Sequence, residues 1–327
     1  MTPVANVAIH PSQFPEQVRR DLLESLRTRR VNHKFHYDSV KQTQKWLALH
    51  QIYSPTRNDA DCLAIYEKSF RATAALIQSA GVTVIGLGCG GGQKDARLLE
   101  LLAAPGRGVG YAPCDVAVAM VLVARQTASA VVPADRCYPF VFDLAVADDL
   151  PTLFDNALPT GASRVHTFFG MIPNFEPRLV LPKLAALLRP GDLLLFSANL
   201  APGPDYAAGV QNILSQYDNA PTREWLLTFL LDLGVERGDG DLRFGIEADP
   251  ASGLRRVVAH FHFTRSCRLE IESDVFNFPA GSAIRLFFSY RYTPGRVRLL
   301  LEELGLSVGE EWITPSEEEG VFLCRRT

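Results

Sequence analysis

An apolar run that ends in a cluster of glycines and passes directly into a helical pattern constrains this chain more than any other feature. It reads Val82-Thr83-Val84-Ile85-Gly86-Leu87-Gly88-Cys89-Gly90-Gly91-Gly92-Gln93-Lys94. This order predicts a buried strand, a tight turn and a helix start. Glycines allow positive φ angles and a close approach of backbone to ligand, and the first helical turn presents unpaired N–H groups. We therefore expect a nucleotide-like cofactor here; the alternative is a flexible strand-to-helix connection without a ligand.

Two acidic residues at the ends of later strands distinguish between cofactors. An apolar run over 109–114 stops at Asp115, about twenty residues beyond the glycines, where a carboxylate can accept both hydroxyls of a ribose. That position suits NAD and S-adenosylmethionine alike. A third run, 138–142, stops at Asp143, where S-adenosylmethionine enzymes commonly bind the adenine amino group. The pair favours S-adenosylmethionine, although a single such acid is as often an ordinary solvated loop residue.

The order of expected elements indicates the fold class. From residue 59 to about 200, strands alternate with helices, which is typical of parallel strands joined by helical crossovers. After 201–204 short alternating segments predict antiparallel strands, and a last helix and strand could return to the first sheet. The elements expected in this second half are a helix over 221–233, strands over 243–246, 255–263 and 267–271, a helix over 293–304 and a strand over 320–325. We expect an α/β protein with a second, smaller α+β domain.

Composition argues against several classes of function. The 327 residues are 47% hydrophobic and 21% charged, and the formal net charge of −3 leaves no basic field for nucleic acid or an anionic membrane. No apolar run reaches the length of a membrane span, and residues 1–18 lack the pattern of a secretory signal. The six cysteines form no C-x-x-C pair, so we expect reduced thiols and no metal site. We expect a cytoplasmic monomer that acts on a small molecule.

Several short motifs follow one another in a specific order. They are Tyr37-Asp38, Tyr53-x-Pro55-Thr56-Arg57, Gly86-Leu87-Gly88-x-Gly90-x-x-x-Lys94, Asp115-Val116, Phe142-Asp143, Ile172-x-Asn174-Phe175, Tyr217-Asp218 and Phe288-Ser289-Tyr290-Arg291-Tyr292. As an ordered set they resemble the histidine Nα-methyltransferase family of ergothioneine biosynthesis over nearly the whole chain. The resemblance implies a Rossmann-like class I S-adenosylmethionine-dependent methyltransferase with a family-specific domain, the amino-acid substrate lying between the two. The implied division is 1–58 for the N-terminal part of the substrate domain, 59–200 for the cofactor-binding core, 201–285 for the inserted part of the substrate domain and 286–327 for the return to the core.

The same resemblance assigns cofactor contacts. Gly88 and Gly90 would pass beneath the methionine part of the cofactor, and Lys94 would meet its carboxylate. Asp115 would bind the ribose. The adenine would lie against Asp143 and the adjacent Leu144. Without the family motif, Lys94 would be taken for a solvated lysine of a first helical turn.

The resemblance also assigns the substrate side. Asn174 would hold the α-amino group, Tyr53 and Tyr217 would hold the α-carboxylate or water bound to it, and Tyr37 would line the same cavity. Methyl transfer is an in-line displacement by a neutral amine. The α-ammonium group must first lose a proton, either to solvent or through a tyrosine and water relay. Asn174 and Tyr37 are therefore the catalytic candidates. Tyrosines at such positions can equally be core residues whose ring is buried and whose hydroxyl reaches solvent.

One departure from the family bears on the substrate. The histidine enzymes carry Glu-x-Ser where this chain has Phe287-Phe288-Ser289, and a phenyl ring cannot accept an imidazole N–H. A second pocket position falls on Phe261. An aromatic pocket favours an aromatic amino acid, tryptophan first, because Ser289 could still accept an indole N–H. Alternatively, the phenylalanines shrink the pocket around a smaller apolar side chain, or Phe287 is a core residue turned away from it.

Two smaller departures concern the backbone and the cofactor turn. Pro173 replaces the glycine that usually precedes the amine-binding asparagine, and the acid often found at the position of Gly86 is absent.

Three other functions remain open beside tryptophan Nα-methylation. They are histidine Nα-methylation, a non-catalytic S-adenosylmethionine sensor, and an NAD-dependent oxidoreductase built on the same glycine turn.

Overall fold

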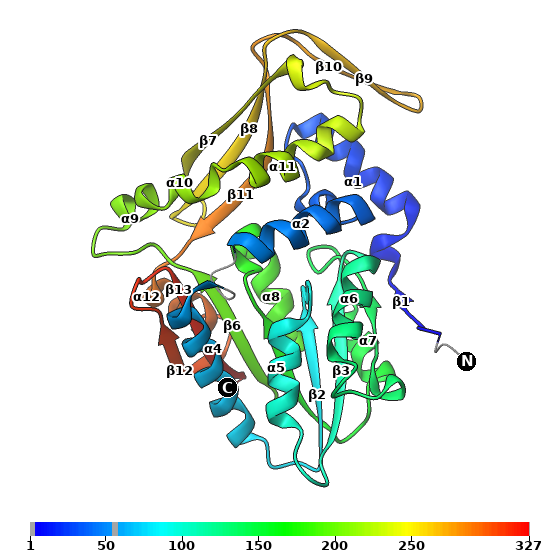
Figure 1. Cartoon of the computed structure of the whole chain (residues 1–327), viewed down its shortest axis with the longest axis vertical. Helices are drawn as coiled ribbons and strands as arrows, with labels where there is room; N and C mark the ends of the chain where they lie inside the picture. Colours follow the sequence, from blue (N-terminus) through cyan, green and yellow to red (C-terminus); the bar gives the residue numbers. More distant parts are fainter. Residues whose placement is uncertain (1–3, 54–57, 327) are drawn as a thin grey trace.

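An eight-stranded sheet forms the lower part of the molecule in the computed structural model, which describes residues 4–53 and 58–326 (Figure 1). Its strands are β1 (Ala8–Ile9), β2 (Gly81–Leu87), β3 (Gly108–Asp115), β4 (Phe140–Val141), β5 (Ser163–Phe168), β6 (Leu193–Asn199), β12 (Leu306–Ile313) and β13 (Glu319–Arg326). They lie in the order β1-β4-β3-β2-β5-β6-β13-β12. The first six pair in parallel, whereas β13 runs antiparallel to β6 and to β12. The predicted return of the last strand to the first sheet is confirmed, and β12 is an additional strand.

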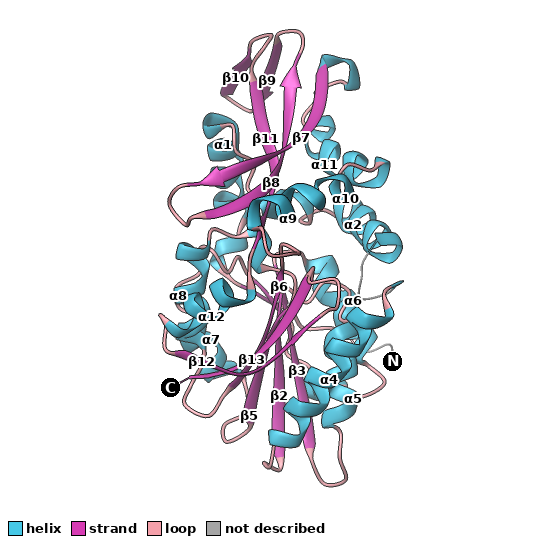
Figure 2. Cartoon of the chain, turned by 90° about the vertical axis from the view of Figure 1, so that its left-hand side faces the viewer, coloured by secondary structure: helices cyan, strands magenta, loops and turns pink. Residues whose placement is uncertain are grey.

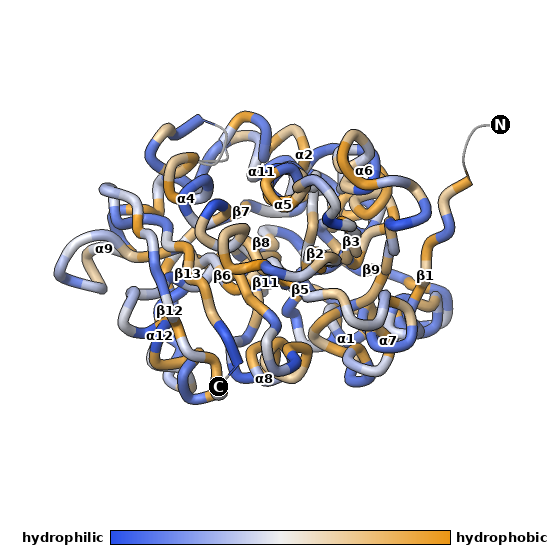
Figure 3. Tube along the Cα trace, turned by 90° about the horizontal axis from the view of Figure 1, so that it is seen from below, coloured by the Kyte–Doolittle hydropathy of each residue, from blue (hydrophilic) through white to orange (hydrophobic). Residues whose placement is uncertain are grey.

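Helices cover both faces of this sheet. They are α4 (Ala60–Leu76), α5 (Gln93–Leu102), α6 (Val118–Ala128), α7 (Leu150–Ala157), α8 (Pro177–Leu187) and α12 (Pro294–Glu302). Seen from below, α4, α5 and α6 lie on one side of the strands, and α7, α8 and α12 lie on the other (Figure 3). The sequence of β2 is a continuous apolar run because both faces of the strand are buried. Val82 and Val84 belong to one buried hydrophobic cluster, and Ile85 and Leu87 belong to another. The Rossmann-like α/β fold expected from the sequence is therefore confirmed.

A second domain lies above the carboxyl ends of the parallel strands (Figures 1 and 2). Its strands are β7 (Gly240–Asp249), β8 (Leu254–Phe263), β9 (Cys267–Ile271), β10 (Asp274–Phe278) and β11 (Ala283–Arg291), and its helices are α1 (Pro15–Thr28), α2 (Val40–Tyr53), α9 (Tyr206–Asn212), α10 (Leu214–Tyr217) and α11 (Ala220–Asp232). Strands β11, β8 and β7 form an antiparallel sheet, and β9 and β10 form a hairpin. The expected boundary at 285/286 falls inside β11, which pairs with β8 on both sides of it.

The N-terminal segment and the insertion share one core. Leu26 of α1, Trp225 of α11, Phe261 of β8 and Phe287 of β11 belong to the same buried cluster. A backbone hydrogen bond from the Val31 N–H to the Arg285 carbonyl oxygen joins the two segments directly. Segments more than 200 residues apart in the sequence therefore form one unit above the sheet. Short 3-10 helices occur at Pro11–Gln13, His33–His36, Ala134–Arg136, Ile172–Asn174 and Arg237–Asp239.

Within residues 4–53 and 58–326, no helix has the length and apolar content that a membrane span requires. The same residues contain no group of three or more His, Cys, Asp or Glu side chains placed to share a metal ion. All six cysteines are free thiols.

Candidate active site

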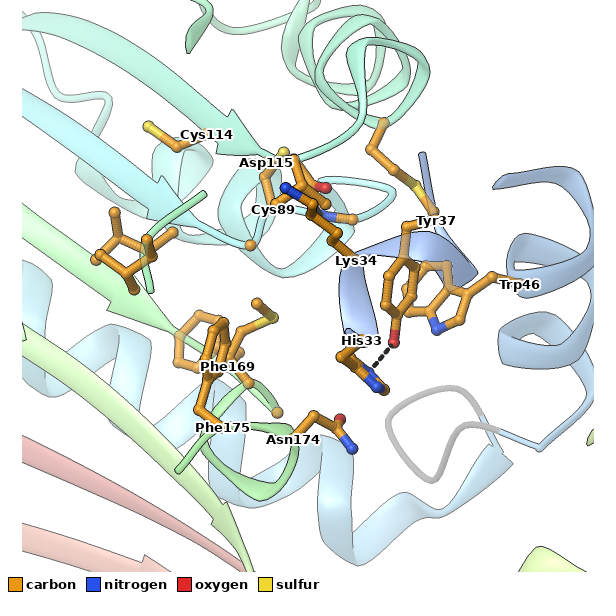
Figure 4. Close-up of a pocket in the computed structure, with 18 of the residues that line it drawn as sticks. His33, Lys34, Tyr37, Trp46, Cys89, Cys114, Asp115, Phe169, Asn174 and Phe175 are labelled. Carbon is orange, nitrogen blue, oxygen red and sulfur yellow. Dashed lines mark hydrogen bonds between the residues drawn. The ribbon is translucent and has the colours of Figure 1, made fainter. Parts of the chain in front are cut away.

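One cavity of about 780 Å³ lies between the carboxyl ends of the parallel strands and the N-terminal segment above them (Figure 4). The glycine turn, Asp115 and Asp143 line it, and so do Tyr37 and Asn174. The residues predicted to bind the cofactor therefore share one space with both residues predicted to be catalytic.

The glycine turn after β2 adopts a backbone that other residues resist. Gly88 and Gly90 have φ angles of +66° and +50°, in the left-handed region that disfavours a Cβ. A Cβ added to Gly88 would lie 2.3 Å from Met171 Sδ on the cavity wall. Gly92 (φ +76°) precedes α5, and a Cβ there would lie 2.7 Å from the Cα of Ala124. These glycines bring bare backbone to the cavity and let α5 start there.

Asp115 stands at the end of β3 beside the glycine turn. Its Oδ2 accepts a hydrogen bond from the Gly90 N–H at 3.3 Å, and its Oδ1 accepts one from the Ala117 N–H at 3.1 Å. Burial raises the pKa of Asp115 to about 6, although the backbone N–H groups oppose that shift. A ribose diol donating to this carboxylate would stabilise its charged form.

Asp143 follows β4 and faces a lysine that sequence reasoning missed. Its Oδ1 accepts from the Ala145 N–H at 3.0 Å, while its Oδ2 is buried without a hydrogen bond. The Nζ of Lys34 lies 3.4 Å from that Oδ2 and also pairs with Asp21. Leu144 is buried and lines the same part of the cavity. A carboxylate oxygen that has an ion pair with Lys34 but no hydrogen bond, beside an apolar wall, fits an adenine ring with its amino group.

Lys94 lies in the first turn of α5 and contacts Tyr66 of α4. Its Nζ donates to the Tyr66 hydroxyl at 3.0 Å and lies 4.1 Å from the centre of that ring. The same hydroxyl donates to Oε1 of Glu319 at 2.6 Å, at the start of β13. Burial lowers the pKa of Lys94 and raises the pKa of Glu319. All three residues line the cavity.

The acid that is absent at Gly86 has a spatial counterpart. A Cβ added to Gly86 would lie 2.2 Å from Oδ2 of Asp95, on α5. That carboxylate is buried and accepts hydrogen bonds from Tyr111 and Thr167, each at 2.7 Å. Asp95 therefore occupies the space that a side chain at position 86 would need, and it also lines the cavity.

The catalytic candidates face the cavity from two different segments. Figure 4 shows His33 and Tyr37 on the N-terminal segment and Asn174 on the loop after β5, with their side chains toward the same space. The Tyr37 hydroxyl lies 2.7 Å from Nε2 of His33, and Nδ2 of Asn174 donates to the Phe288 carbonyl oxygen at 2.6 Å. Burial lowers the pKa of His33 and raises the pKa of Tyr37. Both rings are therefore neutral near pH 7.

Two of the predicted substrate residues line a neighbouring cavity of about 280 Å³. Tyr53 and Tyr217 lie on its wall, and Asn199 and Glu319 line both cavities. The Tyr217 hydroxyl accepts from Nη2 of Arg291 at 2.8 Å and lies 2.9 Å from Oγ of Ser289. Most of the motif that begins at Tyr53 (54–57) falls outside the described residues.

Three other predicted substrate residues lie outside the lining of both cavities. Phe261 is 2% exposed within the core of the second domain, and Ser289 is equally buried. The Phe287 ring packs against His33, Tyr217 and Trp225 at centroid distances of 5.7, 5.8 and 6.2 Å. Phe287 thus has the core position that the sequence left open as an alternative.

Residues that sequence reasoning missed complete the wall of the larger cavity. Among them are His33, Lys34, Trp46, Arg285, Phe288 and Glu319. Phe288 belongs to the motif Phe288-Ser289-Tyr290-Arg291-Tyr292 and directly follows Phe287, which the sequence analysis predicted as the pocket residue. The others carry no local signal, because a single charged or aromatic residue in a helix, a turn or a strand is ordinary.

A comparison with protein families decides the class of the protein. Residues 18–326 match the model of a family described as histidine-specific, S-adenosylmethionine-dependent methyltransferases. The chain belongs to this family. The methyltransferase therefore uses S-adenosylmethionine as its cofactor, and the glycine turn and the two strand-end acids are suited to bind it. A comparison with curated proteins gave no match.

Solved structures of other methyltransferases resemble the chain more distantly. Magnesium protoporphyrin IX methyltransferase from Synechocystis PCC 6803, with bound SAH, is 12% identical with a TM-score of 0.44, covering 90% of this chain and 98% of its own. The mitomycin 7-O-methyltransferase MmcR is 15% identical with a TM-score of 0.43, covering 97% of this chain and 70% of its own. A 1,6-didemethyltoxoflavin-N1-methyltransferase from Burkholderia thailandensis is 14% identical with a TM-score of 0.39, covering 87% of this chain and 90% of its own.

Proposed function

We propose that this methyltransferase transfers a methyl group from S-adenosylmethionine to the α-amino group of an aromatic amino acid. One observation carries the proposal: a single cavity is lined both by the glycine turn with Asp115 and Asp143 and by Tyr37 with Asn174. An amine held by Asn174 would therefore face the cofactor directly.

The bound cofactor supplies an electrophilic methyl group on a cationic sulfur, and the protein supplies position. Nδ2 of Asn174 is committed to the Phe288 carbonyl, so its Oδ1 is left to accept an N–H of the amine. That contact orients the lone pair without adding charge, and orientation of this kind supplies much of the rate in a bimolecular displacement. The hydroxyl of Tyr37, held by His33, can pass the ammonium proton to solvent while remaining neutral itself.

The second cavity is suited to the α-carboxylate. Arg291 is 5% exposed and donates to the Tyr217 hydroxyl, and its Nε is buried without a hydrogen bond. Tyr53 lines the same cavity. A carboxylate next to Tyr217 would receive hydrogen bonds polarised by a guanidinium.

The walls of the larger cavity support an aromatic side chain. Trp46, Phe175 and Phe288 contribute rings to them, and ring pairs add to the free energy of simple burial. Glu176 lies on the same wall, but Arg256 donates to its Oε1 at 3.1 Å, and the Tyr290 hydroxyl, which also lies 2.9 Å from Oδ2 of Asp249, is 2.7 Å from its Oε2. Tryptophan is therefore our first candidate. Histidine is the second, because the matching family is described as histidine-specific.

A methyl-transfer screen tests the proposal. The purified protein is incubated with methyl-labelled S-adenosylmethionine and each standard amino acid, and products are separated by mass. We expect a methylated aromatic amino acid, with tryptophan giving more product than histidine. Absence of product from every amino acid would refute the proposal and would favour a cofactor-binding sensor.

A further inference from the structure

At the cavity wall, Lys94 and Glu319 both form hydrogen bonds with the hydroxyl of Tyr66 but form no ion pair with each other. The Tyr66 hydroxyl accepts from Nζ of Lys94 at 3.0 Å and donates to Oε1 of Glu319 at 2.6 Å. Neither Lys94 nor Glu319 forms an ion pair within 4.0 Å with any side chain of the described residues. Charges enclosed in a protein normally pair or gain several hydrogen bonds. This arrangement therefore leaves bonding capacity on both groups.

Tyr66 and a second ring hold the two charges apart. The Lys94 ammonium lies over the Tyr66 ring and 5.4 Å from the centre of the Phe169 ring. Tyr66 is 3% exposed and is fixed in the core beneath α4. Since the hydroxyl already bridges the pair, the ammonium and the carboxylate can each turn a free donor or acceptor to the cavity that both line.

Other acids near this end of the cavity have partners of their own. Both oxygens of Glu67 accept from Arg97, and both oxygens of Asp95 accept from Tyr111 and Thr167. Glu319 differs from them because only hydroxyl groups, those of Tyr66 and Ser197, contact its carboxylate, and no lysine or arginine of residues 4–53 and 58–326 pairs with it within 4.0 Å. A ligand that brings one ammonium and one carboxylate on the same carbon would complement Lys94 and Glu319 together.

We propose that Glu319 binds the ammonium group of the methionine part of S-adenosylmethionine while Lys94 binds its carboxylate, with Tyr66 as the residue that positions both. Glu319, the first residue of β13, thereby recognises the amino-acid end of the cofactor. Lys94 has this role in the expectation drawn from the family motif; Glu319 and Tyr66 are additions from the geometry. The proposal concerns the cofactor alone, so it stands or falls independently of the amino-acid substrate.

Calorimetric titration with two ligands tests it. S-adenosylhomocysteine carries the amino-acid end, whereas 5′-methylthioadenosine has the same nucleoside and sulfur without that end. Glu319→Gln keeps the shape and the contact with Tyr66 but loses the negative charge. We expect it to weaken S-adenosylhomocysteine binding about 10- to 100-fold, the range of a lost charge-assisted hydrogen bond, and to change 5′-methylthioadenosine binding by less than about threefold.

Further variants separate recognition from a structural role. Glu319→Asp should recover part of the lost affinity, and Tyr66→Phe should weaken S-adenosylhomocysteine alone, by about 3- to 10-fold. Glu318→Gln is the matched control. Glu318 is the neighbour of Glu319 in the sequence, but its carboxylate accepts a hydrogen bond from Gln216 and lines only the smaller cavity. An equal loss for both ligands in Glu319→Gln, or no loss for either, would overturn the proposal. If Glu319→Gln does not fold, the ligand selectivity of Tyr66→Phe decides.

Discussion

Replacement of Asn174 by alanine tests the proposed catalytic arrangement most sharply, because the structure shows which atom of its amide is already committed. The Phe288 carbonyl oxygen lies 2.6 Å from Nδ2 of Asn174, and an oxygen in that place would be repelled. Oδ1 is therefore the atom available to the substrate. Asn174→Ala removes this acceptor and leaves the glycine turn and both strand-end acids in place.

The expected magnitude follows from one lost hydrogen bond to a group that is charged when it arrives. Such bonds are worth about 1.5–3 kcal/mol, and about 1.4 kcal/mol corresponds to a tenfold change in rate. We therefore expect kcat/KM for methyl transfer to fall about 10- to 150-fold. Loss of the bond to Phe288 should lower the free energy of unfolding by about 1 kcal/mol, which is too little to unfold the protein.

Asn174→Asp refines the test. A carboxylate keeps an acceptor but favours the protonated amine, which has no lone pair for attack, and it cannot donate to the Phe288 carbonyl. We expect kcat to fall while KM changes little. The assays are steady-state methyl transfer, thermal unfolding and S-adenosylhomocysteine titration on the same samples. Full activity of Asn174→Ala, with its cofactor affinity unchanged, would refute the assignment of Asn174 to the amine.

Three further predictions follow from the geometry. Gly88→Ala places a Cβ against Met171 at a positive φ angle, so S-adenosylhomocysteine affinity should fall about tenfold or more; titration of the folded variant checks this, and unchanged affinity would contradict it. Because the pKa of Asp115 is raised to about 6 and a ribose diol requires the carboxylate, S-adenosylhomocysteine affinity should fall as pH drops below about 6, by up to tenfold per pH unit; Asp115→Asn should bind weakly and with a shallower pH dependence, because Asp143 and Glu319, whose pKa values burial also raises, still titrate. Phe287→Glu buries a carboxylate among rings, so it should lower the free energy of unfolding by at least about 2 kcal/mol; denaturant unfolding measures this, and an unchanged free energy of unfolding would contradict it.

The fold could be predicted where local pattern and burial agree. The run over 82–87 is apolar because β2 is covered on both faces, and the glycines after it mark a turn that only they adopt easily. The strand β12 was missed because most of its residues are partly or fully exposed, so it lacks the apolar alternation of a half-buried strand. Its place is set by pairing with β13, a contact that no local pattern reveals.

The residues of the candidate site also differ in how far the sequence could predict them. Asp115 and Asp143 were identified because the ends of parallel strands meet at one edge of a sheet. Lys34 and Glu319 were missed because tertiary contacts alone bring them to the cavity. In β11, the register against β8 shifts between Arg285 and Phe287. This bulge breaks the period of two, so Arg285 and Phe288 line the cavity while Phe287 and Ser289 do not.

The central claim is that the amine of an amino acid faces the cofactor inside the larger cavity, and the position of the transferred methyl group tests it most directly. The protein is incubated with tryptophan and ¹³C-methyl S-adenosylmethionine, and the labelled atom is located by NMR. We predict a carbon-13 methyl group bonded to the α-nitrogen. A label on the indole ring or the carboxylate, or no labelled amino acid when histidine and the other standard amino acids are also supplied, would contradict the account.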